Sequence, residues 1–289
     1  MKIGAHVSIA KGLSSAVEYA ESVGCECFQI FAKSPRQWHG PPLDPDAVEL
    51  YLETLSASEI SAAFTHTAYL LNLATAEPLL RRRSIVALTD ELVRGAELGV
   101  AGVITHVGSD PHEDPSAAAQ RVADAVRDAL AAADAHATRR VDLLLENTAG
   151  AGRTYGGPIE HLAAVFALLG DARARVGLCL DTCHAHAFGY DVRTDVGWDQ
   201  LLGLIRDQCG GEAIRAVHAN DCVAPVGSHR DRHAWVGDGE IGLPGFSAML
   251  RREELAEVCA ITEMPGELPA KDILNIQRLK MLRGECDSG

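Results

Sequence analysis

Six side chains of metal-binding type recur along the chain at intervals of about 40 residues. Each ends a short apolar run, and the runs read FTH, GVITH, VDLLLEN, VGLCLD, AIRAVHAN and VCAITE. A carboxylate directly after an apolar strand is costly to bury without a cation, so a metal is the expected partner. Imidazole and carboxylate ligands favour Zn²⁺ or Mn²⁺ at an open catalytic site. The six residues are His66, His106, Glu146, Asp181, His218 and Glu263.

Two short motifs add three more candidate ligands. In DTCHAHAFGYD, His184 follows Asp181 by three residues. In SHRDRH, Asp231 and His233 are two residues apart, so both side chains leave one side of an extended segment. Nine nitrogen and oxygen ligands are too many for one metal ion and are enough for two or three.

The spacing of these residues implies elements that bring them together. Val-, Ile- and Leu-rich runs predict eight strands alternating with helical patterns, which is typical of a parallel sheet. We therefore expect an α/β fold, a (β/α)8 TIM barrel spanning residues 1–289 as a single domain, with a frayed tail after about residue 280. An open doubly wound sheet or a repeat architecture are the alternatives. The predicted strands are 2–7, 26–31, 61–66, 102–107, 141–146, 176–181, 213–218 and 258–263.

Composition places the protein among globular enzymes of the cytoplasm. The 289-residue chain has no apolar stretch near the ~20 residues of a membrane span, and its first residues are too polar for a signal peptide. Eight cysteines without a CxxC pair indicate free thiols. The net charge of −14 argues against nucleic acid as a partner, but bound metal ions would change the local field.

The chain also resembles a known family. The segments GAHVS, RQW, HTAYLLNL, THVGS, LENTAG, DTCHAHAFGYD, HAND, DRH and GDGEIG are similar to signature segments of bacterial endonuclease IV, from Met1 to about Glu263. The resemblance implies a (β/α)8 barrel and a zinc-dependent apurinic/apyrimidinic endonuclease of base excision repair. It also implies three Zn²⁺ ions per chain, with Mn²⁺ as a substitute, no organic cofactor, and duplex DNA containing abasic sites as the partner. We expect a monomer that associates with the nucleoid when it acts on DNA.

The resemblance assigns residues as well. It implies that Glu146 bridges two zinc ions, and that Glu146, Asp181 and Glu263 are the catalytic carboxylates. The first ion has the ligands His66, His106 and Glu146; the second has Glu146, Asp181, His218 and Glu263; the third has His184, Asp231 and His233. DNA contacts are implied for a loop after the second strand, a loop after the third, and the DRH motif: Arg36, Gln37, Trp38, Tyr69, Leu70 and Arg232.

Three positions depart from the family pattern. Ser34-Pro35 replaces an expected polar pair, His186 stands where an apolar residue is expected, and Met264 follows Glu263 where a Thr is common. His39, His112, His136 and His161 are expected to be structural or solvated.

The expected reaction is hydrolysis of the phosphodiester 5′ to an abasic site, giving a 3′-hydroxyl and a 5′-deoxyribose phosphate, with removal of 3′-blocking groups. The alternatives are a metal-dependent sugar isomerase or epimerase of similar fold, and a non-catalytic binder of damaged DNA.

Overall fold

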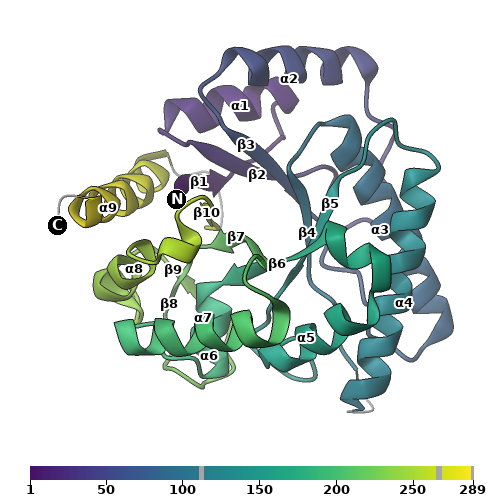
Figure 1. The fold of residues 1–289 in the computed structure, drawn as a ribbon. Coiled ribbons are helices and arrows are strands. Elements are labelled where there is room, and N and C mark those ends of the chain that lie inside the picture. Colours follow the sequence, from purple (N-terminus) through teal and green to yellow (C-terminus); the bar gives the residue numbers. More distant parts are fainter. Residues whose placement is uncertain (111–113, 265–268, 288–289) are drawn as a thin grey trace.

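The computed structural model is a closed barrel of eight parallel strands surrounded by helices (Figure 1). It describes residues 1–110, 114–264 and 269–287, so His112 lies outside the described residues. The order around the barrel is β1-β10-β7-β6-β5-β4-β3-β2, which confirms the predicted (β/α)8 barrel and excludes the open sheet. The strands lie within two residues of the predicted bounds: β1 Lys2–His6, β2 Cys27–Phe31, β3 Ala62–His66, β4 Gly102–Thr105, β5 Asp142–Glu146, β6 Val176–Asp181, β7 Ile214–His218 and β10 Cys259–Thr262.

Helices connect the strands and form the outer layer. Three of them begin at a proline that follows an acidic residue, and the side chains of Asp44, Glu77 and Asp114 accept hydrogen bonds from backbone N–H groups of the first turn. The final helix continues past Lys280 and packs beside α8 and β1, near the N-terminus (Figure 1). The helices are α1 Leu13–Ser22, α2 Pro45–Ala57, α3 Pro78–Glu97, α4 Pro115–Asp134, α5 Ile159–Leu168, α6 Thr182–Phe188, α7 Asp195–Cys209, α8 Gly242–Leu250 and α9 Pro269–Asp287.

Two separate apolar clusters form the core. The larger lies between the strands and the helices. The smaller includes Phe64, Ile104, Leu144, Cys179, Ala216 and Ile261. Each of these six residues stands two positions before one of the six strand-end candidates. Because side chains alternate along a strand, each pair projects from the same face. The small apolar cluster therefore lies beneath the six candidate ligands and supports them.

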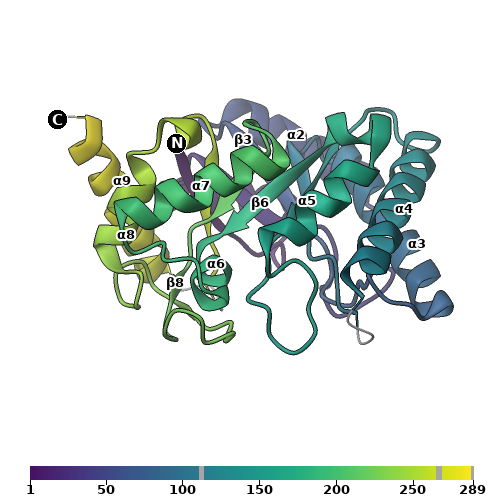
Figure 2. The ribbon, with the colours of Figure 1, turned by 60° about the horizontal axis from the view of Figure 1, so that its bottom comes forward.

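The longer loops lie at the end of the barrel where the strands have their carboxyl ends and where the six strand-end candidates lie. Figure 2 shows α6 and β8 together on this side, at the bottom of the view. There, β8 Asp221–Cys222 and β9 His233–Ala234 form a small antiparallel pair outside the barrel. Within the described residues, no helix is long and apolar enough to cross a membrane. Seven of the eight cysteines are free and buried, as expected, and the side chain of the eighth, Cys286, lies outside the described part.

Candidate metal centre

The nine candidate ligands lie together at the carboxyl ends of the strands. They fall into three groups in which the ligand atoms lie within 4.8 Å of one another. These groups have the same members as the three ligand sets that the resemblance implies. They are His66, His106 and Glu146; then Glu146, Asp181, His218 and Glu263; then His184, Asp231 and His233.

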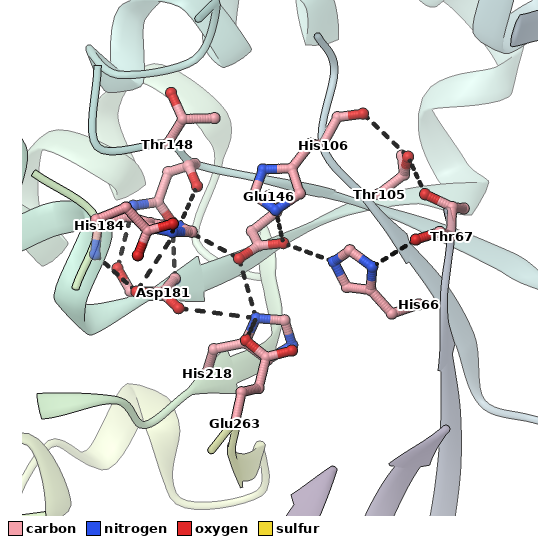
Figure 3. A network of polar contacts seen from close by, with 12 residues as sticks. His66, Thr67, Thr105, His106, Glu146, Thr148, Asp181, His184, His218 and Glu263 are labelled. Carbon is pink, nitrogen blue, oxygen red and sulfur yellow. Dashed lines mark hydrogen bonds and ion pairs between the residues drawn. The ribbon is translucent and has the colours of Figure 1, made fainter. Parts of the chain in front are cut away.

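Glu146 is the centre of this arrangement (Figure 3). It ends β5 and is fully buried. Its Oε2 lies 3.0 Å from His66 Nε2 and 3.2 Å from His106 Nε2. Its Oε1 lies 3.0 Å from His218 Nδ1 and 3.3 Å from His184 Nδ1. Oε2 thus faces the imidazoles of the first group and Oε1 faces His218 of the second group, which is the arrangement expected of a carboxylate that bridges two cations.

Buried amides hold the other two carboxylates. Asn220 Nδ2 donates to Asp181 Oδ2 at 2.7 Å and to Glu263 Oε2 at 3.2 Å. Gln29 Nε2 donates to Glu263 Oε1 at 2.7 Å. Asn147 Oδ1 accepts the backbone N–H of Asp181 at 2.7 Å. Each carboxylate oxygen that accepts one amide N–H keeps a second lone pair for a cation. His218 Nδ1 lies 3.1 Å from Glu263 Oε2.

The third group depends on a loop that one buried aspartate organises. Asp221 follows Asn220 and accepts backbone N–H groups from residues 222, 237, 239, 241 and 242 at 2.8–3.4 Å. A side chain at Gly239 would collide with Asp221 Oδ1, because a Cβ there would lie 2.5 Å from that oxygen. The loop between these contacts carries Asp231 and His233, whose Oδ1 and Nε2 are 3.1 Å apart.

The histidine rings are oriented as metal ligands are. His66 Nδ1–H donates to the carbonyl of Thr67 at 2.8 Å, and His184 Nδ1–H donates to the carbonyl of Asn147 at 2.9 Å. His218 Nε2–H donates to Gln29 Oε1 at 2.9 Å. Such contacts orient the ring and direct the second ring nitrogen toward the centre, where a bound cation would replace its proton.

His233 completes this pattern. Its Nδ1–H donates to the carbonyl of Glu263 at 3.0 Å, and its Nε2 lies 3.1 Å from Asp231 Oδ1 and 3.8 Å from Asp181 Oδ2. A ring nitrogen held between two carboxylates in this way fits a metal ligand. The donor set is therefore suited to hold cations in all three groups.

The charges of the centre are mutually dependent. Burial alone would raise the pKa of Glu146, but the imidazoles of His106 and His218 lower it well below its ordinary range. Burial raises the pKa of Asp181. Burial would lower the pKa of His233, yet its hydrogen bond with Asp231 raises that pKa to about 9. Protons on imidazoles thus balance the buried carboxylates, and a bound cation would displace them.

Cys183 lies near the centre, although sequence patterns indicated no thiol ligand. Cys183 Sγ falls within 4.8 Å of ligand atoms of Asp181 and His233. Its contact with Cys222 and its burial raise the pKa of the Cys183 thiol well above the usual range. Because the thiolate is the form that binds metals, this thiol is a poor ligand.

A cavity of about 850 Å³ opens beside the metal centre. Ligand side chains form its floor, and an apolar wall includes Val7, Ile9 and Phe31. Ser34, Pro35 and Met264, which depart from the family pattern, also line it. Pro265 lies outside the described residues. The third departure, His186, is fully buried and donates from Nε2 to the carbonyl of Ala224 at 3.2 Å, so it faces away from solvent.

Two of the six predicted DNA-contact residues, Tyr69 and Arg232, line this cavity, and Tyr69 is 67% exposed and packs edge-on against Phe31. Arg36 and Gln37 are exposed, as is Leu70. Trp38 differs because it is half-buried against the core, with the guanidinium of Arg83 4.7 Å from its ring centroid. This packing holds Trp38 within its loop, and its contact with DNA stays a prediction.

Three residues of the centre were missed by the sequence patterns. They are Gln29, Asn147 and Asn220, whose neutral amides are not typical zinc ligands. LENTAG and HAND contain two of them. Gln29 stands two residues after Cys27, a member of the smaller apolar cluster, so both side chains project from the same inner face of β2. This spacing was the only indication in the sequence that Gln29 faces the centre. His6, which matches no ligand position, lies beside Gln29, whose Nε2 donates to His6 Nδ1 at 2.8 Å.

Comparisons with known proteins agree with this architecture. Residues 17–282 match a family model described as xylose isomerase-like TIM barrel. A protein named "Probable endonuclease 4" from Methanosphaerula palustris is 39% identical over 282 residues, covering 98% of this chain and 98% of that protein. The crystal structure of endonuclease IV from Thermus thermophilus has a TM-score of 0.86 at 37% identity, covering 99% of this chain and 100% of that chain. The chain belongs to the endonuclease IV family of these barrels.

More distant likeness extends to sugar-converting enzymes. A D-tagatose 3-epimerase-like protein has a TM-score of 0.74 at 18% identity, covering 100% of this chain and 99% of that chain. At this identity the likeness shows the fold alone.

Proposed function

We propose that the protein is a three-zinc endonuclease of base excision repair. It hydrolyses the phosphodiester 5′ to an abasic site in duplex DNA and leaves a 3′-hydroxyl and a 5′-deoxyribose phosphate. The observation that carries the proposal is Glu146, whose Oε2 faces His66 and His106 and whose Oε1 faces His218, at 3.0–3.2 Å. Relatives 36–39% identical over nearly the whole chain carry the name "Probable endonuclease 4".

The reaction forms a P–O bond from water and breaks the P–O3′ bond, and the departing 3′-oxygen takes up a proton. Bound ions would lower the pKa of water and neutralise charge that develops on the phosphate. Glu146, Asp181 and Glu263 are the proposed catalytic carboxylates, since they would hold two of the ions and offer acceptors to the attacking water. Asn220 and Gln29 position Asp181 and Glu263 by the hydrogen bonds described above.

The third ligand group distinguishes this proposal from a sugar isomerase. Asp231 and His233 lie on a loop beyond the barrel strands, and His184 lies 3.2 Å from Asp231. A two-metal sugar enzyme has no use for this extra group. A third cation there would neutralise a phosphate oxygen, which a sugar substrate lacks.

DNA recognition is assigned to exposed loops around the cavity. Arg36, Gln37, Tyr69 and Leu70 would fill the gap in an abasic duplex, and Arg232 would contact a phosphate. We extend the proposal to removal of 3′-blocking groups, to Mn²⁺ as a substitute ion, and to a cytoplasmic monomer without an organic cofactor. The net charge of −14 stays negative with three bound ions, but these ions would add six positive charges at the face that binds DNA.

An incision assay tests the proposal. A labelled duplex with one tetrahydrofuran abasic analogue should be cut on its 5′ side by the zinc-loaded protein, and chelation should abolish cutting. Glu146→Gln should lose both metal and incision, whereas Arg215→Met, at the opposite end of the barrel, should keep both. Epimerisation of a ketose without incision would instead support the sugar-enzyme alternative.

A further inference from the structure

Helix α3 contacts two loops that border the cavity. Loop 32–41 follows β2 and contains Arg36 and Gln37. Loop 67–72 follows β3 and contains Tyr69 and Leu70. The loops are separate in sequence, and both are assigned to DNA recognition in the proposed function, on which this inference rests.

An ion-pair cluster joins the first loop to α3. Lys33 Nζ lies 2.8 Å from Asp90 Oδ2 and 2.8 Å from Glu91 Oε1. Arg94 Nε donates to the same Asp90 oxygen at 3.0 Å. We call Lys33, Asp90, Glu91 and Arg94 the α3 ion-pair cluster.

The far end of loop 32–41 is held as well. Arg94 Nη2 donates to the carbonyls of Gly40 at 3.1 Å and Pro41 at 2.7 Å. Arg83, about three turns before Arg94 on α3, places its guanidinium over the ring of Trp38. The segment that carries Arg36 and Gln37 is therefore fixed at both of its ends by one helix.

The same helix holds the second loop. Glu91 Oε1 also accepts the backbone N–H of Ala68 at 3.4 Å. Ser84 Oγ accepts the backbone N–H of Asn72 at 2.9 Å. Glu91 thus contacts both loops through one oxygen, and the pair of contacts to Ala68 and Asn72 brackets Tyr69 and Leu70.

The burial of Lys33 and Glu91 indicates that the cluster holds the two loops in place and does not itself contact DNA. The side chains of Lys33 and Glu91 are 2% and 1% exposed. Lys33 borders the cavity, but its ammonium faces two carboxylates and is not presented to a phosphate. Removing one partner of such a pair leaves an uncompensated buried charge, so the pair fixes where its two chain segments lie.

We propose that the α3 ion-pair cluster sets the relative position of loops 32–41 and 67–72, and thereby sets how strongly the protein prefers an abasic duplex over an undamaged one. Its members are positioning residues. They touch none of the nine candidate ligands directly, so metal binding does not depend on them.

The test removes both buried charges together. Lys33→Met/Glu91→Gln leaves no unpaired ion and keeps an acceptor for the Ala68 amide, which protects the fold. Arg94→Met releases the carbonyls of Gly40 and Pro41 and the contact with Asp90, but it leaves Lys33 paired with Asp90 and Glu91. Arg215→Met is the matched control, because Arg215 lies 2.6 Å from Asp142 at the opposite end of the barrel. Lys33→Arg tests whether a retained charge rescues the function.

Three quantities are measured for each protein: hydrogen exchange of both loops, bound zinc, and the ratio of dissociation constants for undamaged and abasic duplex at fixed salt. The double variant should raise exchange in both loops and lower the ratio about 10- to 100-fold, with zinc content unchanged. Arg94→Met should loosen the first loop alone, and Lys33→Arg should restore most of the preference.

Exchange and preference equal to those of Arg215→Met would overturn the inference, and so would loosening of only one loop by the double variant. A parent protein without preference for abasic duplex would instead contradict the proposed function. The exchange of the two loops would then still decide whether the cluster couples them.

Discussion

Replacing Gln29 by Met should weaken the second metal group selectively. Gln29 is fully buried, and its amide makes three contacts: it accepts from His218 Nε2–H at 2.9 Å, and it donates to Glu263 Oε1 at 2.7 Å and to His6 Nδ1 at 2.8 Å. Methionine has a similar volume but can make none of them. His218 would lose the partner that fixes its tautomer, and Glu263 would lose its donor.

The expected size follows from these contacts. Loss of a second-layer partner of a ligand typically reduces metal affinity 10- to 100-fold, or roughly 1.4–2.7 kcal/mol. Each buried group left unpaired costs about 1–3 kcal/mol of stability. The unfolding temperature of the metal-free variant should therefore be several degrees below that of the metal-free parent. The first and third groups contain neither His218 nor Glu263 as ligands, and their affinities should stay near the parent values.

Competition against a chromophoric chelator measures each affinity. Arg175→Met serves as the control, since Arg175 Nη1 donates to the two oxygens of Asp134 at 2.7 and 2.8 Å and Nη2 donates to the carbonyl of Val141 at 2.7 Å, at the opposite end of the barrel. It should lower the unfolding temperature without changing zinc affinity. Parental affinity for all three ions in Gln29→Met would refute the role given to this amide.

The remaining predictions concern the loop, the third ion and the fold. Asp221→Asn replaces one acceptor oxygen by an NH₂ group facing two or three backbone N–H donors, so calorimetry should show a loss of roughly 2–6 kcal/mol; an unchanged unfolding temperature would contradict it. Asp231→Ala should remove about one zinc per chain and leave the other two, as counted by elemental analysis; loss of all three would argue against a separate third group. Burial alone would raise the pKa of Glu26, but Arg283 lowers it to about 2, so its stabilising contribution is present above pH 4.5 and lost as pH falls toward 2. Discounted for partial exposure, the pair contributes about 1–2 kcal/mol, and urea unfolding of Glu26→Gln should show that deficit at pH 7 and none near pH 2.

The fold and the nine candidate ligands were predictable because both follow from short-range patterns. A carboxylate at the end of an apolar run, as at Glu146, marks a strand end and a cation site together. Two-residue alternation then places such side chains on the inner face. The supporting amides were harder, since Gln29 within CFQIF carries no charge that demands a partner. Its role follows from the barrel closing β2 toward β1 and β3.

The other contacts could not be predicted because they join residues that lie far apart in the sequence. Lys33 and Glu91 are 58 positions apart, and no local pattern pairs them. The stacking of Arg83 on Trp38 depends on where α3 lies, so the sequence could not predict it, and the DNA contact of Trp38 stays a prediction. The GDGEIG segment resembled a signature without an evident purpose. The structure shows its backbone donating to Asp221, which orders the loop that carries Asp231.

Anomalous scattering from crystals of the zinc-loaded protein, recorded at the zinc edge, tests the central claim most directly. Three peaks per chain should appear, two of them flanking the Glu146 carboxylate and one beside Asp231. A single peak near Glu146, or peaks elsewhere that leave Glu146 contacting only imidazoles, would contradict the bridging role on which the proposed hydrolysis depends.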